Sequence, residues 1–437
     1  MEWYATIALL LGLIVGLMLL GMPIAMAFLA ANIVAAMLFM GGASGIAQVL
    51  NNGFGGMTSF ALVPIPMFLL MGELFYYTGL AARMFNAIDR LLGNVRGRLA
   101  YVTVIGGTGF AALSGSSMGA TALLGSLMVP EMMKRGYSKN LSMGPIMGTG
   151  GLAVIIPPSA LAVLLATLGR SDVGALLLAG VIPGLILAGL YALLIFVWTL
   201  LAPGAAPPYS VERVPWPAKL RLLVLDVVPM LAVIVLVIGI MVAGYATPTE
   251  AAAVGCLAVM VLAVCYRALT WNSFRKSVDA ALRVTVMAFL IIFGSATFSQ
   301  LLAFSGASGG LISWATQFDI SALGMLLVMV GIIFFLGCFM DQLSMMLLTA
   351  PIFFPLAKTL GFDLTWFGLI MLLALEVGYT TPPFGLLLFV MKGVAPAGTT
   401  MREIYVAAAP FIACVLALIG LIIAFPPLAT WLPGVSR

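Results

Sequence analysis

Apolar residues run along this chain in long uninterrupted stretches, and the polar residues collect between them. Clear examples are Val173–Leu201, Val227–Val242 and Tyr405–Phe425, while the run Ile7–Leu20 continues past Pro23 into a second one. A helix needs roughly 20 apolar residues to cross the hydrocarbon core of a bilayer. Glycine and proline, rather than charge, divide the runs. The pattern predicts an all-α polytopic membrane protein embedded in a lipid bilayer.

Composition supports this prediction, because 63% of the residues are apolar and only 8% are charged. A soluble domain could not cover its surface with so few charged groups. The net charge of +5 comes from basic residues scattered singly between the apolar runs, which indicates membrane topology rather than nucleic-acid binding. The chain contains no histidine, so a histidine-ligated metal and a histidine proton relay are excluded.

The prolines and glycines recur at one constant offset. Pro23 and Pro248 lie 225 positions apart (248 − 23), and the same shift relates the other prominent breaks. These are Pro130 with Pro355, Gly136 with Gly361, and Pro157-Pro158 with Pro382-Pro383. Shared helix breakers imply a shared backbone shape. We therefore divide the chain into a first repeat, residues 1–202, a linker, residues 203–225, and a second repeat, residues 226–437.

Each repeat has the same predicted parts, namely about five membrane crossings, one re-entrant helical hairpin and one helix broken by Pro-Pro. An odd number of crossings turns the second repeat upside down. The charges agree, because Gly42–Ser59 has no charge whereas its counterpart Arg267–Val284 has four basic residues. Conversely, Leu80–Arg98 has four basic residues, and its counterpart Ser305–Leu323 has no basic residue. The positive-inside rule then predicts inverted-topology repeats, a cytoplasmic linker and two external termini.

Polar groups at membrane depth mark the candidate site. The Pro-Pro breaks free backbone carbonyls, and the hairpin tips Ser114–Ser117 and Met340–Ser344 supply hydroxyls and the carboxylate of Asp341. Such oxygen ligands suit a small cation. Three alternatives stay open: a simple kink at each break, close helix packing by the small serines, and a hydrogen bond between Asp341 and the tip backbone.

Three further acids lie in the apolar runs. Thr247-Pro-Thr-Glu250 has the pattern of a capping box, which favours a structural role for Glu250. Glu376 lies one turn before Thr380, so supporting the site and a purely structural role are equally open, and the role of Glu73 is unsettled. No Lys or Arg falls inside a predicted span. An anionic substrate would therefore be met by helix N-termini, hydroxyls and co-bound cations, which favours cation-coupled transport.

Several motifs resemble those of one transporter family. They are Ala246–Gly255, Ser114–Ser117, Gly150–Ser159, Ala179–Gly184 and Glu376–Gly385. Together they make the chain similar to the large membrane subunit of a tripartite ATP-independent periplasmic (TRAP) transporter. The resemblance implies a protein of the bacterial inner membrane, with both termini in the periplasm on the topology above. It also implies uptake of small organic acids such as C4-dicarboxylates, usually by sodium symport and an elevator movement.

The resemblance further implies two protein partners. One is a periplasmic substrate-binding protein, and the other is a small membrane subunit of about four helices. No apolar segment is left over for a fused small subunit, so we expect it to be a separate chain. The transport domain would comprise about residues 99–170 and 323–392, with the remaining spans as scaffold. Leu80–Arg98 and Ser305–Ser321 would be the connecting arms.

We expect sodium as the coupling ion and no other cofactor. The sodium-binding candidates are Ser114, Ser116, Ser117, Gly150, Gly337, Asp341, Thr380 and Thr381. The substrate-binding candidates are Ser116, Pro157, Pro158, Ser159, Gln342, Pro382 and Pro383, with Glu376 in support. The first rival function is a stand-alone cation-coupled carboxylate or drug carrier of a related inverted-repeat fold. The second is an intramembrane enzyme, which the absence of histidine and of a close aspartate pair disfavours.

Overall fold

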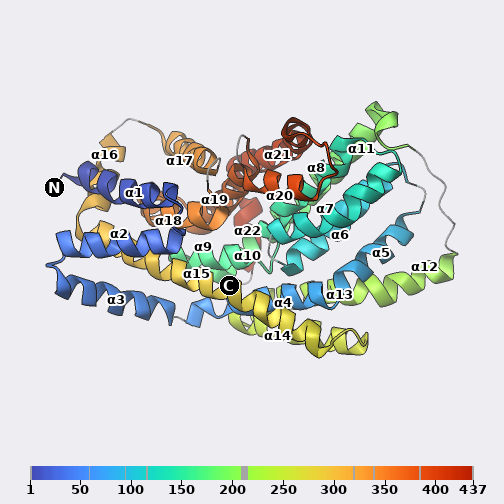
Figure 1. Cartoon of the computed structure of the whole chain (residues 1–437), viewed down its shortest axis with the longest axis horizontal. Helices are drawn as coiled ribbons and strands as arrows, with labels where there is room; N and C mark the ends of the chain where they lie inside the picture. Colours follow the sequence, from blue (N-terminus) through green and yellow to red (C-terminus); the bar gives the residue numbers. More distant parts are fainter. Residues whose placement is uncertain are drawn as a thin grey trace.

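A computed structural model of the chain describes residues 2–58, 60–93, 95–114, 117–207, 215–317, 320–337, 340–382 and 385–435. Within these ranges the secondary structure is entirely helical (Figure 1). The predicted all-α class is thus confirmed. Five helices are long and apolar enough to cross a membrane, or up to seven spans if two sharply bent helix pairs are each counted as one, among the described residues.

The first repeat contains α1 to α11 and the 3₁₀ turn η1. Their bounds are α1 (Trp3–Leu19), α2 (Ile24–Phe39), α3 (Ala43–Met57), η1 (Phe60–Leu62), α4 (Pro64–Tyr77), α5 (Leu80–Leu92), α6 (Arg98–Ser114), α7 (Ser117–Lys134), α8 (Lys139–Ile155), α9 (Ala160–Leu168), α10 (Val173–Ala179) and α11 (Val181–Leu201). The predicted hairpin is α6 with α7. The Pro-Pro break separates α8 from α9, which meet at 48°.

The remaining chain begins with the short turn η2 (Pro203–Ala205). The elements after it are α12 (Trp216–Leu222), η3 (Leu223–Val227), α13 (Val228–Val242), α14 (Pro248–Cys265), α15 (Trp271–Phe304), α16 (Ala307–Gln317), α17 (Ala322–Gly337), α18 (Gln342–Thr359), α19 (Leu364–Thr380), α20 (Leu386–Val394), α21 (Met401–Ala424) and α22 (Pro427–Val435). The second hairpin is α17 with α18. Helices α7 and α18 both have 18 residues and begin 225 positions apart (342 − 117). Helices α8 and α19 both have 17 and also begin 225 apart (364 − 139).

The helix ends follow from local sequence. Gly136 and Gly361, with φ of 82° and 78°, stop α7 and α18 in a backbone region that favours glycine. Ser138 and Asp363 then cap α8 and α19 through their side chains. At the start of α14, Thr247 and Glu250 form the predicted capping box, with Glu250 Oε2 accepting from Thr247 N at 2.7 Å. The structural interpretation of Glu250 is therefore confirmed.

Helices continue through two segments that the sequence predicts as connections. The chain is helical again from Trp216, inside the predicted linker of residues 203–225, because the prolines on either side of Trp216 suit a helix start. In the second repeat, the connecting segment and the third span form one helix of 34 residues, α15. In the first repeat the same stretch is divided into α3, η1 and α4, because Pro64 and Pro66 stand where the second repeat has Phe289 and Ile291.

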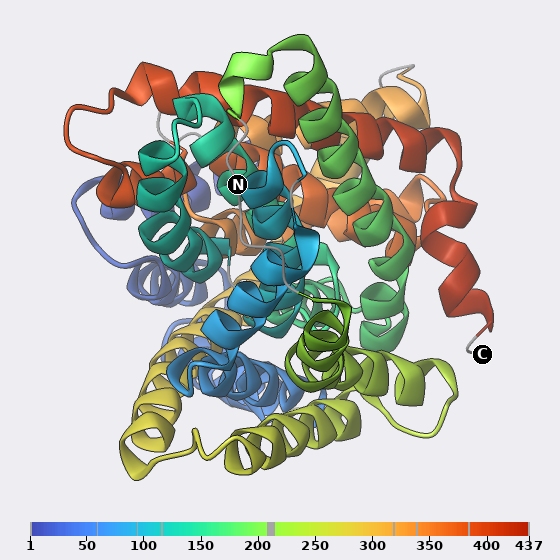
Figure 2. The same ribbon diagram turned by 90° about the vertical axis from the view of Figure 1, so that its right-hand side faces the viewer.

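The helices pack into two groups (Figures 1 and 2). In the first, which we call the α15 group, α15 packs against α2, α3 and α4, and α14 packs against α4 and α13. Buried Asn32 of α2 joins this group by donating to Gly294 O of α15 at 2.7 Å. In the second, the α8–α19 group, α8 packs against α6, α7, α11, α19 and α21, and α19 also packs against α17 and α18. The groups meet where α4 contacts α6 and α9, and α15 contacts α18.

Candidate functional site

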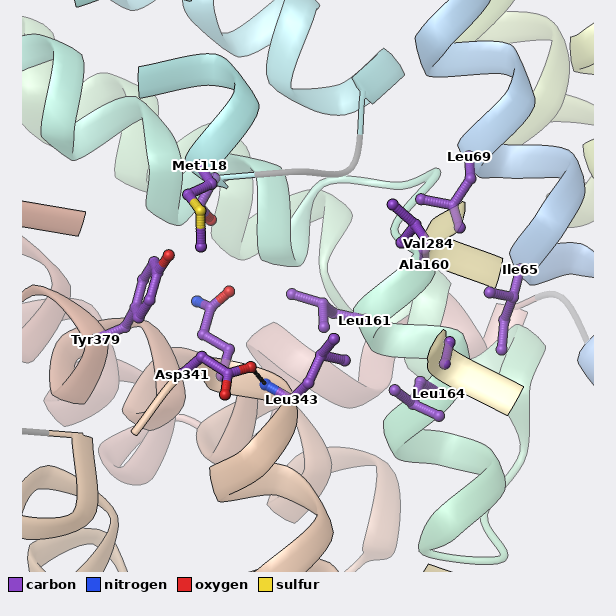
Figure 3. A pocket seen from close by; sticks show the side chains of 13 residues that line it. Ile65, Leu69, Met118, Ala160, Leu161, Leu164, Val284, Asp341, Leu343 and Tyr379 are labelled. Carbon is purple, nitrogen blue, oxygen red and sulfur yellow. Dashed lines mark hydrogen bonds between the residues drawn. The ribbon is translucent and has the colours of Figure 1, made fainter. Parts of the chain in front are cut away.

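A cavity of about 140 Å³ lies between the two helix groups. Ile65 and Leu69 of α4, with Val284 and Ala288 of α15, form the wall from the α15 group. The remaining lining residues come from α7, α9, α18 with its cap, and α19, and are Ser117, Met118, Ala160, Leu161, Leu164, Asp341, Gln342, Leu343 and Tyr379 (Figure 3). The lining from α4 and α15 is therefore apolar, and the polar groups among the described lining residues come from α7, α18 with its cap, and α19.

Three helices of the α8–α19 group begin at this cavity. The lining includes the first residues of α7, α9 and α18, which are Ser117, Ala160 and Gln342. The first turn of a helix carries backbone N–H groups without intrahelical partners and the positive end of the helix dipole. Two of these helices follow the tips of the hairpins, and α9 follows the first Pro-Pro break. Residues next to both hairpin tips and next to the first Pro-Pro break therefore line one cavity.

Buried hydrogen bonds connect the polar wall to the middle of α19. The Ser117 hydroxyl lies 2.8 Å from Gly150 O and 3.1 Å from Glu376 Oε2, so its one hydrogen is shared between two acceptors. The Gln342 amide Nε2 donates to the same Glu376 Oε2. Ser117, Gln342 and Glu376 are all at least nine-tenths buried. Glu376 thus stands directly behind two residues that line the cavity.

Asp341 lines the cavity and also caps α18. Its Oδ2 accepts from Leu343 N at 3.1 Å and from Ser344 N at 3.4 Å, and Ser344 Oγ donates to its Oδ1. This is the backbone hydrogen bond that the sequence left open as an alternative to ion binding. The two roles are compatible, because a carboxylate offers about four lone-pair positions.

The other polar candidates mainly satisfy their own backbone. Thr380 Oγ1 donates to Glu376 O at 2.9 Å, and Thr381 Oγ1 donates to Val377 O at 2.5 Å. Ser159 Oγ donates to Val154 O at 2.6 Å across the first break and accepts from Ala162 N at 3.2 Å. These side chains stabilise the broken end of α19 and the start of α9. Only the remaining lone pairs of their hydroxyl oxygens could bind a ligand.

The remaining candidates divide into placed and unplaced residues. Pro157 and Pro158, joined by a cis peptide bond, link α8 to α9, and Pro382 follows α19. Gly337 packs against α19, where a Cβ on it would lie 2.3 Å from Gly378 Cα, so its lack of a side chain permits a close helix approach. Ser116, Pro383 and the side chain of Ser114 lie outside the described residues.

Sequence reasoning missed most of the cavity wall. Tyr379, next to the second break, was not a candidate, although its place beside two threonines was a usable signal. The apolar lining residues Ile65, Leu69 and Val284 have no such signal, because a cavity-facing leucine and a lipid-facing leucine look alike in an apolar run. Among the described residues, no group of three or more Asp, Glu, Cys or His side chains could hold a metal ion.

Comparison with known proteins decides the family. The profile of the family "Tripartite ATP-independent periplasmic transporter, DctM component" matches residues 11–428. The chain belongs to this family. The resemblance drawn from the sequence motifs is therefore confirmed. This DctM-family chain is 33% identical over 378 residues to the C4-dicarboxylate TRAP transporter large permease protein DctM of Pseudomonas aeruginosa, covering 86% of each chain.

Of two further relatives of this DctM-family chain, one carries the same substrate name and one a different name. It is 32% identical to the C4-dicarboxylate large permease protein DctM of Rhodobacter capsulatus, covering 97% of this chain and 98% of the relative. It is 28% identical to the sialic acid large permease protein SiaM of Vibrio cholerae, covering 96% of both. All three relatives are permeases, so the coarse function is that of a TRAP transporter large permease subunit in a membrane.

Solved structures show a related fold at low sequence identity. The YdaH transporter of Alcanivorax borkumensis matches with a TM-score of 0.60 at 14% identity, covering 88% of this chain and 90% of that one. MtrF of Neisseria gonorrhoeae matches with a TM-score of 0.58 at 16% identity, covering 86% and 84%. At these identities the likeness concerns the fold alone.

Proposed function

We propose that this chain is the translocating subunit of a sodium-coupled, binding-protein-dependent importer of a small organic acid. The observation that carries the proposal is membership of the DctM family over residues 11–428. We further propose a separate small four-helix membrane subunit and a periplasmic substrate-binding protein as its partners. The complex lies in the bacterial inner membrane.

An anionic substrate fits the chemistry of the cavity. The described lining contains no Lys or Arg, whereas the N-termini of α7, α9 and α18 meet there. Helix N-termini attract negative groups through their free N–H groups and their dipoles. Asp341 alone would repel a carboxylate, but a cation bound beside Asp341 would remove that repulsion. Cation binding before or with the substrate follows from this arrangement.

We propose inverted repeats, and two contacts support them. Lys139, at the start of α8, forms an ion pair with Glu403, at the start of α21, with Nζ and Oε1 2.7 Å apart. In repeats of the same orientation, α21 would instead start on the side of the membrane where α9 ends and α10 begins. The Trp3 ring also lies 5.8 Å from that of Trp314 in α16, which inversion places on the same outer side. Both termini are then periplasmic.

We propose an elevator movement of the α8–α19 group against the α15 group. The cavity at their boundary supports it, since such a movement would carry one wall of the cavity past the other. The division predicted from the sequence places the last spans, α11 and α21, in the scaffold. Both pack against α8, and α21 also packs against α19, so we propose that they move with the hairpins.

The test is uptake of organic acids by the reconstituted three-part complex in liposomes with an imposed sodium gradient. The panel should contain C4-dicarboxylates, a sialic acid and ectoine, which are the substrates named for relatives. We expect uptake of at least one acid, only with sodium outside and only with both partners present. Uptake by this chain alone would instead support the stand-alone carrier.

A further inference from the structure

Glu376 is the one buried side chain of α19 that hydrogen-bonds to residues of both hairpins among those described. Its partners are Ser117, the first residue of α7, and Gln342, the first residue of α18. These two residues are also repeat counterparts, 225 positions apart (342 − 117). One carboxylate oxygen, Glu376 Oε2, therefore joins the same point of both hairpins.

The first repeat has no carboxylate to match Glu376. The counterpart position is Gly151 (376 − 225), and the residue before it is Gly150. A Cβ on Gly151 would lie 3.3 Å from Glu376 Cγ, and a Cβ on Gly150 would lie 3.0 Å from Glu376 Oε1. The two glycines thus leave the room that the Glu376 side chain needs to pass α8 and reach Ser117 of the opposite repeat.

The other carboxylate oxygen, Oε1, accepts no hydrogen bond from the described residues of either hairpin. Glu376 Oε1 and the Tyr191 hydroxyl of α11 are both buried without a hydrogen-bond partner among the described residues. Both residues line a void of about 10 Å³, which is close to the space that one water molecule needs. A Cβ on Gly151 would lie within 4 Å of both oxygens, so both border the same small space beside that glycine. A water in that space would hold the carboxylate from behind as well as in front.

We propose that Glu376 is a positioning residue that couples the two hairpins. It acts behind the cavity, through Ser117 and Gln342, so that a displacement of either hairpin start is transmitted to the other. Each donor holds the carboxylate in the position that the other donor uses, so the loss of one weakens the other bond. The effects of removing them are therefore not independent. The functional meaning of the coupling rests on the proposed transport function, but the coupling itself is a property of the folded chain.

Hydrogen exchange of the full chain in lipid nanodiscs tests the coupling without any transport. We expect Ser117→Ala, in the first hairpin, to speed amide exchange at the start of α18 by about threefold or more. Gln342→Ala should do the same at the start of α7. Ser126→Ala is the matched control, since Ser126 lies on α7 but donates only to Leu123 O of its own helix, and it should leave α18 unchanged.

Variants of Glu376 complete the test. Glu376→Leu should speed exchange at both hairpin starts, and Ser117→Ala added to it should not change α18 further. Glu376→Gln keeps one oxygen that can accept from both donors, so it should restore both helices to near the native rate. The proposal would be overturned if Ser117→Ala left amide exchange at the start of α18 unchanged. It would also be overturned if Ser117→Ala sped exchange at α18 equally well when Glu376 is already replaced by Leu.

In the reconstituted complex, the same variants have a second readout. Ser117→Ala and Gln342→Ala should each raise the half-saturating concentrations of sodium and of substrate. Their combined effect should depart from the product of the single effects by about threefold or more, and this departure should vanish with Glu376→Leu. A complex that transports no organic acid would refute the proposed function while the exchange result still decides the coupling.

Discussion

Asp341 uses both of its carboxylate oxygens at the start of α18 and still faces the cavity. A cap needs only an oxygen acceptor, which Asn supplies as well as Asp does. Bound sodium would need the negative charge as well. The two roles of this residue can therefore be separated by one substitution that keeps the shape.

We predict that Asp341→Asn raises the half-saturating sodium concentration for uptake roughly tenfold, equivalent to about 1.4 kcal/mol, and leaves the thermal stability unchanged. Asp363→Asn is the matched control, because Asp363 caps α19 by accepting from Thr365 N and Trp366 N, and it is not part of the cavity lining. Sodium titration of uptake measures both. An unaltered sodium response in Asp341→Asn would leave Asp341 as a cap only.

Replacing Tyr191 by Phe can raise or lower the stability of the protein, and the direction shows whether the Tyr191 hydroxyl has a hydrogen-bond partner. If a water joins the Tyr191 hydroxyl to Glu376 Oε1, Tyr191→Phe removes a hydroxyl that makes a hydrogen bond, and it should destabilise the protein by about 1 kcal/mol. If the hydroxyl has no partner, the same change removes a desolvation penalty and should stabilise it. Thermal unfolding in detergent distinguishes the two, and we expect destabilisation. Exposed Tyr245 is the control, where the same substitution should have no effect.

At the scale of elements, α17 and α19 approach each other so closely that no side chain fits between them. A Cβ on Gly337 would lie 2.3 Å from the Cα of Gly378. This contact fixes the second hairpin against the helix that carries Glu376. Helix packing therefore explains why position 337 is a glycine, without any role in sodium binding.

Gly337→Ala should therefore destabilise the protein by about 3 kcal/mol, because the two backbones must separate to admit the methyl group. Gly331→Ala, on the same helix, meets nothing within 4 Å and should be neutral or slightly stabilising. The thermal unfolding midpoints of the two variants in detergent give the comparison. Equal midpoints would contradict the close approach.

The sequence predicts the elements best where helix breakers are strong. The constant offset between Pro130 and Pro355, and between the two Pro-Pro pairs, locates the hairpins and the broken helices. The fusion of the connecting segment with the third span in α15 was missed, although the signal was present. Phe289 and Ile291 replace the two prolines that divide the first repeat, and a continuous helix follows.

The candidate site was predicted less completely, and the reason is physical. Ser117, Asp341, Gln342 and Glu376 were found because polar groups are costly at membrane depth. The fact that Ser117 and Gln342 share one carboxylate oxygen depends on how α7, α18 and α19 meet in space. No periodicity along the chain encodes that meeting. Likewise, α4 and α15 line the cavity only because of how they pack against the other helices.

For the whole molecule, the side of the membrane on which each segment lies distinguishes inverted repeats from repeats of the same orientation. Asn51 of α3 and Lys276 of α15 are repeat counterparts, 225 positions apart (276 − 51), and both are exposed. Inverted repeats place them on opposite faces. Repeats of the same orientation would place them on the same face.

We predict that Asn51→Cys reacts with a membrane-impermeant maleimide from the periplasm, and Lys276→Cys from the cytoplasm. The background should lack the four native cysteines. Labelling of intact cells and of inverted vesicles measures the two sides. Reaction of both positions from one side would rule out the inverted arrangement.

The contact between Gly151 and Glu376 also bears on how the two repeats arose. Identical ancestral copies would have carried the same residue at both positions. Glutamates at both positions would have crowded this crossing, because a Cβ at position 151 would lie 3.3 Å from Glu376 Cγ, and two like charges would have met in a buried place. If the halves arose by duplication, a carboxylate in one copy beside a small residue in the other required the two copies to diverge at this position.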